Sequence, residues 1–236
     1  MKNSSFTLIA IVFIALSANS RAIKAQENKD IAITNFTEVS VSSGIDLYLT
    51  QSSSENIRVS AHADLLKNVV VEKKGNNLNI RYKDNISWGR LFKGQSIKVY
   101  VNYKTLQAIS ASGGSDVYSQ NTLKTDKLSI SASGGSDIDL NVAAKDIQIQ
   151  TSGGSDVNIK GNATNMEASS SGGSDIDALG FVVENARVTA SGGSDANIHV
   201  TKALDVTASG GSDVNYKGNP AVKKSSGKSG EVNKIN

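Results

Sequence analysis

The chain contains no cysteine among its 236 residues. No disulfide bond can therefore stabilise the fold, and the lipid-modified cysteine of a bacterial lipoprotein is excluded as well. Histidine is almost as scarce, with two residues, so the usual cysteine and histidine ligands of a zinc site are not available. The folded chain must be held together by side-chain packing and backbone hydrogen bonds, which a stack of bonded repeats can provide.

A long apolar segment is also missing, because the apolar run over residues 6–16 is shorter than the ~20 residues that span a bilayer. Lys2 precedes this run and small residues follow it up to Ala25, which is typical of a secretory signal. The sequence predicts a signal peptide over residues 1–25 and no transmembrane segment in the mature chain. The protein is expected to be exported to the periplasm, the outer surface or the extracellular space.

A basic surface is the third absence. The formal charge of +3 comes from Lys2, Arg21 and Lys24, which leave with the signal, so the mature chain has 22 basic and 22 acidic residues. Residues 106–218 are acidic, with 7 basic and 13 acidic side chains. Because nucleic-acid binding requires a basic stripe, nucleic acid is not an expected partner.

The sequence is rich in one motif, Ser-Gly-Gly-Ser-Asp, which occurs six times. Successive copies begin 21, 19, 19, 20 and 18 residues apart. Apolar residues alternate with polar ones around each copy, as in Leu128 and Ile130 before the motif and Ile138 and Leu140 after it. This alternation places the apolar residues and the second serine inside and the aspartate outside. The two glycines supply the positive φ angles of a tight corner.

One strand–corner–strand unit about every 20 residues is typical of a parallel β-helix. A second turn is expected between corners, for example near residues 141–145 and at Gly161. The predicted fold is all-β, a single-stranded right-handed parallel β-helix (solenoid) with about 20 residues per rung, the hand following from the general rule for parallel crossovers. Residues 106–218 form the regular repeats, and residues 219–236 form an atypical closing rung or a flexible tail.

Residues 26–105 are less regular and are predicted to form a β-rich N-terminal cap over the open end of the stack. Ser42-Ser43-Gly44-Ile45-Asp46 is a degenerate copy of the corner, and a hairpin is expected around Gly75. A turn of helix is expected near residues 64–67. Most of the chain's aromatic residues lie in this part, and its simplest role is to cover the open end of the stack; they include Phe36, Tyr48, Tyr82, Tyr100 and Tyr103.

One loop of the cap is instead a candidate for ligand binding. It contains Trp88, Arg90 and Phe92. Exposed tryptophan and arginine side chains are favoured in binding hot spots. These three residues are therefore candidate ligand contacts.

The corner and the segment around it resemble a known family. Ser43-Gly44-Ile45-Asp46, the β-rich segment after it and the stacked Ser-Gly-Gly-Ser-Asp turns are similar to the GIN-domain family of auto-transporter adhesin heads, over residues 30–235. The family's naming triad is Gly-Ile-Asn, and Asp46 replaces its asparagine here. The resemblance implies a pectin-lyase-like right-handed β-helix, export from a Bacteroidetes-type bacterium and a role in cell adhesion. It implies no catalytic residue.

The aspartates of the corners should form a column along the outside of the stack. A second column, two residues further on, holds Asp139, Asn158, Asp177, Asn197 and Asn215. Three interpretations remain open: the aspartates accept backbone hydrogen bonds, pairs such as Asp137 with Asp139 bind calcium, or outward carboxylate pairs hydrolyse glycosides. Catalysis needs one distinctive site, whereas every rung offers nearly the same pair, so repetition favours structure or multivalent binding.

The sequence as a whole predicts a non-enzymatic, exported β-helix protein that binds or adheres at the cell envelope without a cofactor. Candidate partners are a glycan, a cell-surface protein, and a second copy of the chain in a homo-oligomer. Asp139 and Asp177, where the repeat varies, join Trp88, Arg90 and Phe92 as candidate ligand contacts. The alternatives are a carbohydrate-active enzyme on the same fold and a calcium-stabilised structural protein.

Overall fold

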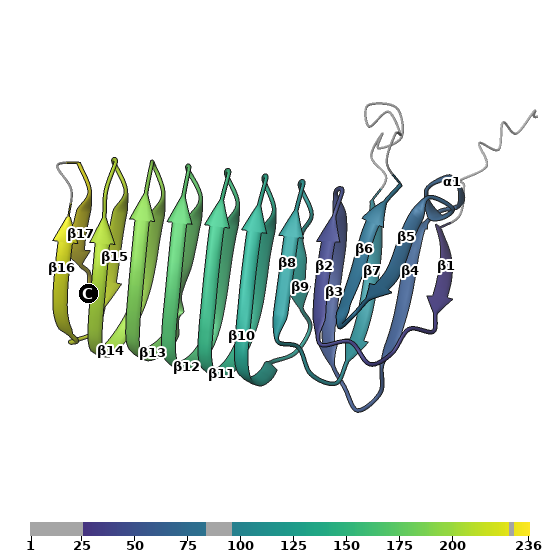
Figure 1. Ribbon diagram of the computed structural model, residues 1–236, viewed down its shortest axis with the longest axis horizontal. Helices are drawn as coiled ribbons and strands as arrows, with labels where there is room; N and C mark the ends of the chain where they lie inside the picture. Colours follow the sequence, from purple (N-terminus) through teal and green to yellow (C-terminus); the bar gives the residue numbers. More distant parts are fainter. Residues whose placement is uncertain (1–25, 84–95, 227–228) are drawn as a thin grey trace, which may run out of the picture.

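The computed structural model describes residues 26–83, 96–226 and 229–236. Most of these residues are in β-strands (Figure 1). The amino-terminal part comprises β1 (Gln26–Ile31), β2 (Glu38–Ser42), β3 (Ile45–Gln51), β4 (Asn56–His62), α1 (Ala63–Leu66), β5 (Val69–Lys74), β6 (Asn77–Tyr82) and β7 (Ile97–Tyr103). The repeats comprise β8 (Ala108–Ser112), β9 (Val117–Ser119), β10 (Leu123–Ser133), β11 (Asp137–Ser152), β12 (Asp156–Ser171), β13 (Asp175–Ser191), β14 (Asp195–Ala208) and β15 (Asp213–Lys217). The chain closes with β16 (Ala221–Ser226) and β17 (Glu231–Lys234).

Parallel pairing stacks the repeats into a solenoid, which confirms the predicted β-helix (Figure 1). Each rung pairs with the next through equivalent residues, so Ile130 lies opposite Ile149 and Ile138 opposite Val157. Both pairs are 19 residues apart, the spacing of the corner motif at these rungs. The paired apolar residues are buried in one continuous core.

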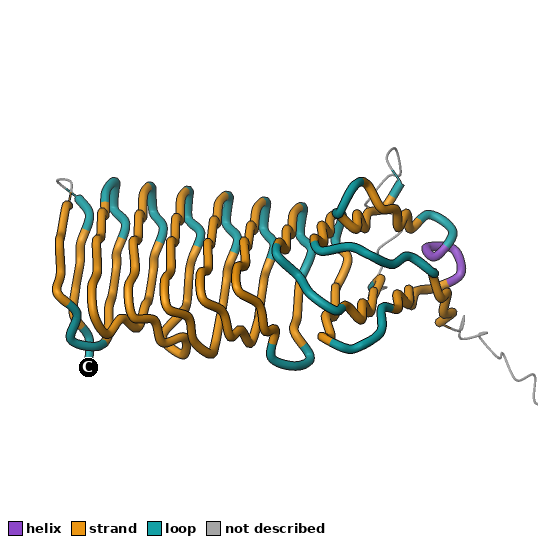
Figure 2. Tube along the Cα trace, turned by 60° about the horizontal axis from the view of Figure 1, so that its bottom comes forward, coloured by secondary structure: helices purple, strands orange, loops and turns teal. Residues whose placement is uncertain are grey.

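The second bend of each rung differs from the prediction, because β11 to β14 run through it without a break (Figure 2). Backbone pairing between β11 and β12 continues across the bend, as between Val142 and Gly161, whereas the register shifts at the bend between β12 and β13 and between β13 and β14. Gly161 is required there. Its φ of +120° suits glycine alone, and a Cβ atom would collide with the carbonyl oxygen of Val142.

The corners confirm the predicted orientation of the second serine. All six of these serines are fully buried, namely Ser115, Ser136, Ser155, Ser174, Ser194 and Ser212. In the earlier rungs the hydroxyl group joins two rungs: Ser155 Oγ accepts a hydrogen bond from the Ser136 amide at 3.1 Å. In later rungs it closes its own corner, where Ser194 Oγ donates to the carbonyl oxygen of Ser191 at 2.9 Å. The serine therefore fills a small space and also satisfies buried backbone groups.

The degenerate corner belongs to a true rung, made by β2 and β3. Val39 lies opposite Ile109 and Leu47 opposite Val117, so this rung continues the phase of the repeats. The chain then forms the cap on the other side of the same rung, where β6 pairs with β2 and β7 with β3. β1 and β4 extend this end with antiparallel pairs. A mixed sheet therefore covers the amino-terminal end, and its order in space differs from its order in sequence.

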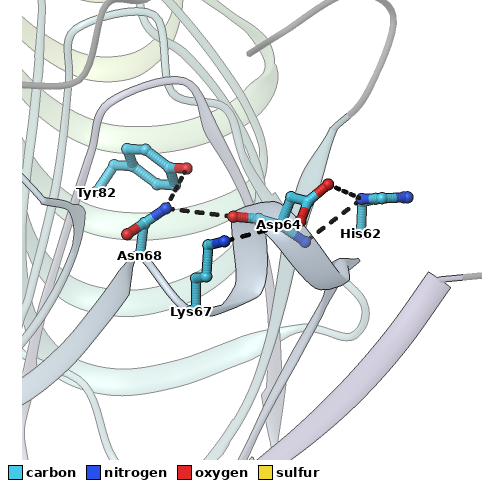
Figure 3. A network of polar contacts seen from close by, with 5 residues as sticks. All are labelled: His62, Asp64, Lys67, Asn68 and Tyr82. Carbon is cyan, nitrogen blue, oxygen red and sulfur yellow. Dashed lines mark hydrogen bonds and ion pairs between the residues drawn. The ribbon is translucent and has the colours of Figure 1, made fainter.

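Local contacts fix the connection between β4 and β5 (Figure 3). His62 Nδ1 accepts a hydrogen bond from the Asp64 amide at 3.4 Å and so caps α1, near the predicted helical turn. The side-chain amide of Asn68 donates to the Asp64 carbonyl oxygen and to the Tyr82 hydroxyl group, both at 3.2 Å. The predicted hairpin is β5 and β6, and its turn contains Gly75 with φ +61°.

The last two strands add a further rung to the stack. β16 pairs with β14 and β17 with β15, with Val222 opposite Leu204 and Val232 opposite Val214. The Lys224 ammonium group donates to the Val232 carbonyl oxygen at 3.0 Å and joins the two strands. Among the described residues, no helix has the length and hydropathy needed to cross a membrane.

Candidate functional site

The strands that follow the corners share one outward face, which we call the post-corner face. It includes β3, β9, β15, β17 and the part of β11, β12, β13 and β14 that precedes the second bend, and the cap extends it through β7, β4 and β1. Because the rungs are in register, equivalent outward residues form columns along the axis.

The first column carries charge. Lys98 of the cap lies opposite Asp46, and the column continues through seven further carboxylates at Asp116, Asp137, Asp156, Asp175, Asp195, Asp213 and Glu231. We call it the acid column. Carboxylates of this column accept backbone hydrogen bonds, from the Asp195 amide to Asp175 Oδ1 at 3.2 Å and from the Asp213 amide to Asp195 Oδ1 at 3.3 Å, and the backbone of Asp137 likewise bonds the Asp116 carboxylate. These contacts agree with the predicted role of aspartate as an acceptor, but the donor belongs to the next rung.

The second column begins with three tyrosines. The ring centroids of Tyr48 and Tyr100 are 5.0 Å apart, and those of Tyr48 and Tyr118 are 5.3 Å apart, with interplanar angles of 18° and 24°. We call these residues the tyrosine stack. Tyr100 is 40% exposed, and Tyr48 and Tyr118 are half-buried. The column continues as an Asn/Asp column, which consists of Asp139, Asn158, Asp177, Asn197, Asn215 and Asn233.

Among the aromatic residues of the cap, Phe36, Tyr82 and Tyr103 are buried, whereas Tyr48 and Tyr100 lie on the outward face. Period-two alternation already decides the point, since their neighbours Leu47 and Val99 are fully buried and leave the tyrosines outside. The signal was present in the sequence as the matching triplets Asp-Leu-Tyr at 46–48 and Asp-Val-Tyr at 116–118.

Charges surround the tyrosine stack. The Lys98 ammonium group lies 5.9 Å from the ring centroid of Tyr48, within cation–π range. Burial raises the pKa of Asp46, although Lys98 opposes this shift. Burial and the charge of Asp46 raise the pKa of Asp116. Burial, with help from the nearby carboxylates, also raises the pKa of Tyr118 to about 12.

A hollow lies at each end of the tyrosine stack. On the side of the repeats, a hollow of about 270 Å³ is lined by Tyr48, Tyr118, Ser119, Gln120 and Asp139. Asp139 lies directly opposite Tyr118 on the neighbouring rung. On the side of the cap, a hollow of about 500 Å³ is lined by Asn28, Asn56, Arg58, Ser60, Tyr100 and Asn102. Both hollows therefore combine an aromatic ring with hydrogen-bonding side chains.

The predicted site residues are not brought together. Asp139 lies in the hollow beside Tyr118, whereas Asp177 lies two rungs away, ~9.6 Å along the axis, with Asn158 between them. Asp177 accepts a hydrogen bond from the Leu179 amide at 3.2 Å, which is a local turn contact. Trp88, Arg90 and Phe92 lie outside the described residues.

The chemistry of this face suits binding. Across residues 26–83, 96–226 and 229–236 there is no group of three histidine, cysteine, aspartate or glutamate side chains that could hold a metal ion. Aromatic rings beside amide and carboxylate groups can instead hold a ligand by contact and hydrogen bonds.

Comparisons with known proteins agree with this fold. Residues 35–220 match the model of a family described as "Putative auto-transporter adhesin, head GIN domain". A search of curated proteins returned no match.

Several solved structures resemble the chain. A protein of Bacteroides fragilis titled a "putative adhesin" has a TM-score of 0.83 and 23% identity, and the alignment covers 90% of this chain and 98% of that one. A "putative adhesin" of Parabacteroides distasonis has a TM-score of 0.73 and 24% identity, with 90% and 98% covered. A "Putative lipid binding protein" of the same species has a TM-score of 0.68 and 18% identity, with 89% and 97% covered. At these identities the likeness concerns the fold.

Proposed function

The chain belongs to the family described as "Putative auto-transporter adhesin, head GIN domain", and on this premise we propose that it is an exported, non-enzymatic adhesin that binds a ligand at the cell envelope. The contact surface is the post-corner face, centred on the tyrosine stack. Export rests on the signal predicted for residues 1–25, which precede the described part of the chain.

The observation that carries the proposal is the outward position of three stacked tyrosines. Single exposed aromatic residues are common on protein surfaces. Three in one column, with a hollow at each end, form a patch of the kind that marks an interaction site. Tyrosine is also among the residues that contribute most to binding energy at interfaces.

Stacked tyrosines also stabilise a sheet through cross-strand contact, which is the competing explanation. The two roles separate at Tyr118, because it is the terminal ring of the stack and lines the hollow beside Asp139. If Tyr118 contacts the ligand, replacing it changes binding as well as stability. If its role is purely structural, replacing it changes stability alone.

The test measures binding of purified residues 26–236 to intact cells and envelope fractions. Tyr118→Ala is expected to weaken binding at least about tenfold, the loss that a hot-spot residue gives. Gln150→Ala is the matched control, because Gln150 is exposed on β11 ahead of its corner, on the opposite face. Both variants are checked by circular dichroism and thermal unfolding. Binding by folded Tyr118→Ala equal to that of the wild type, or no binding by the wild type, would overturn the proposal.

A further inference from the structure

We propose that the ligand of the post-corner face is an uncharged, linear glycan that lies along the axis of the β-helix, with one sugar ring against Tyr118. This inference rests on the proposed adhesin function and adds the class and orientation of the ligand.

The tyrosine stack determines where a ring can bind. Tyr48 lies between Tyr100 and Tyr118, so both of its faces are covered by the other two rings. Tyr118 is the last ring on the side of the repeats, and the residue opposite it in the next rung is the shorter Asp139. Tyr48 also lines the hollow although both of its faces are covered, so the hollow runs along the side of the stack, where one ring of an axial chain can lie against Tyr118.

The lining of this hollow matches the chemistry of a sugar. A pyranose ring has an apolar face of C–H groups and an edge of hydroxyl groups. The Tyr118 ring suits the apolar face, and the Asp139 carboxylate and Gln120 amide suit the hydroxyl groups. The volume of about 270 Å³ is below the ~300–1,000 Å³ of pockets that enclose drug-sized ligands. It therefore suits one unit of a longer chain.

The Asn/Asp column extends the site along the axis. Its members repeat at the rung spacing of ~4.8 Å, and an extended β-linked sugar chain advances by a similar distance per unit. Each sugar can therefore lie beside one rung, and because neighbouring units of a β-1,4-linked chain are turned over, the same edge of the sugar meets the column at every second rung. The amides are partly ordered by one another, since Asn215 Nδ2 donates to Asn197 Oδ1 at 3.0 Å. Each amide has two N–H donors and two acceptor lone pairs, so this contact leaves further groups for a ligand.

The acid column determines the charge of the ligand. It runs parallel to the Asn/Asp column, two residues away on the same strands, and carries eight carboxylates from Asp46 to Glu231. An anionic polysaccharide laid along the axis would meet like charge at every rung. This repulsion favours a glycan without acidic groups.

The opposite face offers a larger hollow, of about 530 Å³, which is lined by Gln107 and by residues of β10, β11 and β12. Its floor is formed by Leu128, Ile147 and Met166, and its lining contains no aromatic residue. Of these two hollows, the one on the post-corner face is therefore the one that offers an aromatic ring to a sugar. The opposite face supplies the control position Gln150.

The first experiment separates glycan from protein ligands. Binding of residues 26–236 to envelope fractions is measured before and after periodate oxidation of vicinal diols, and before and after protease digestion. We expect periodate to reduce binding at least tenfold and protease to leave it unchanged. Tyr118-dependent binding that survives periodate and is lost after protease would overturn this inference and leave the adhesin function standing. No binding to untreated fractions would overturn the adhesin function itself.

The second experiment tests charge and orientation by titration with neutral β-1,4-linked gluco-oligosaccharides and xylo-oligosaccharides of increasing length, whose units carry vicinal diols, and with polygalacturonate. Affinity for a neutral series is expected to rise with length. Tyr118→Ala should weaken binding of short and long oligomers alike, Asn158→Ala should weaken only the long ones, and Gln150→Ala should weaken neither. Preferred binding of polygalacturonate would refute an uncharged ligand. A lack of length dependence, or an Asn158→Ala effect equal for all lengths, would refute the axial orientation.

Discussion

The hydroxyl group of Tyr118 lies 3.5 Å from Oδ2 of Asp116 and donates a hydrogen bond to it. Asp116 in turn lies beside Asp46 of the neighbouring rung, whose charge contributes to the raised pKa of Asp116. The carboxylates of both rungs contribute to the raised pKa of Tyr118. The acid column and the tyrosine stack are therefore coupled electrostatically, and this coupling can be measured.

Replacing Asp116 by asparagine should stabilise the protein slightly at neutral pH. A raised pKa means that the folded state holds the proton more tightly than the unfolded chain does. The stabilisation from Asp116 is therefore fully present below its ordinary value of 3.8 and is lost as pH rises through the folded pKa. We expect Asp116→Asn to raise the free energy of unfolding at neutral pH by up to about 0.5 kcal/mol, a small surface effect. The gain should disappear below pH 3.8.

Denaturant unfolding of the wild type and of Asp116→Asn, at neutral pH and below pH 3.8, measures this difference in the free energy of unfolding. Asp156→Asn is the control, because Asp156 is exposed in the middle of the same column and should show a smaller gain. A loss of stability in Asp116→Asn at neutral pH would contradict the prediction.

Tyr118 should ionise unusually late in an alkaline titration followed by ultraviolet absorbance. Its pKa of about 12 compares with an ordinary value of 10.0, so part of the stability is expected to be lost as pH rises through this window. Tyr118→Phe should remove one transition near pH 12. Asp116→Asn should move that transition to lower pH, because it removes a negative charge beside the phenol. Identical titration curves for wild type and Tyr118→Phe would show that the assignment is wrong.

The buried serine column should be sensitive to loss of a single hydroxyl group. Ser155→Ala removes the acceptor of the buried Ser136 amide, and an unsatisfied buried donor costs about 1–3 kcal/mol. Ser169→Ala is the control, since Ser169 is exposed on the adjacent strand β12. In chemical denaturation, the midpoint of unfolding of Ser155→Ala should be clearly lower than that of the control. Equal midpoints would mean that the hydroxyl group only fills space.

Two glycines test the bends. Gly173→Ala places a side chain at φ +73° with no atom within 4 Å, so it should cost the ~1–2 kcal/mol of left-handed strain alone. Gly161→Ala adds a collision with the carbonyl oxygen of Val142 and should cost about 3 kcal/mol or more. Thermal and denaturant unfolding compare the two variants. Equal stability of the two variants would show that the backbone shifts to remove the collision between the new Cβ atom at position 161 and the Val142 carbonyl oxygen.

The sequence alone determined the solenoid and the orientation of its residues. Alternation fixes which residues of a strand face inward, and the repeated corner fixes the phase from rung to rung. For this reason the alignment of Leu47 with Val117, the burial of the second serine and the column of aspartates followed from the sequence and are found in the structure. The separation of Asp139 from Asp177 by two rungs also follows from the repeat.

The tertiary structure decided which residues meet at the junction of cap and repeats. Tyr48, Tyr100 and Tyr118 stack because β7 and β9 pair with opposite edges of β3. Neither β7 nor β9 follows β3 directly in the sequence. Alternation indicates the face on which a side chain lies, but not the strand beside it. That neighbour is set by backbone hydrogen bonds between segments far apart in the chain, and it turns three separate tyrosines into one surface.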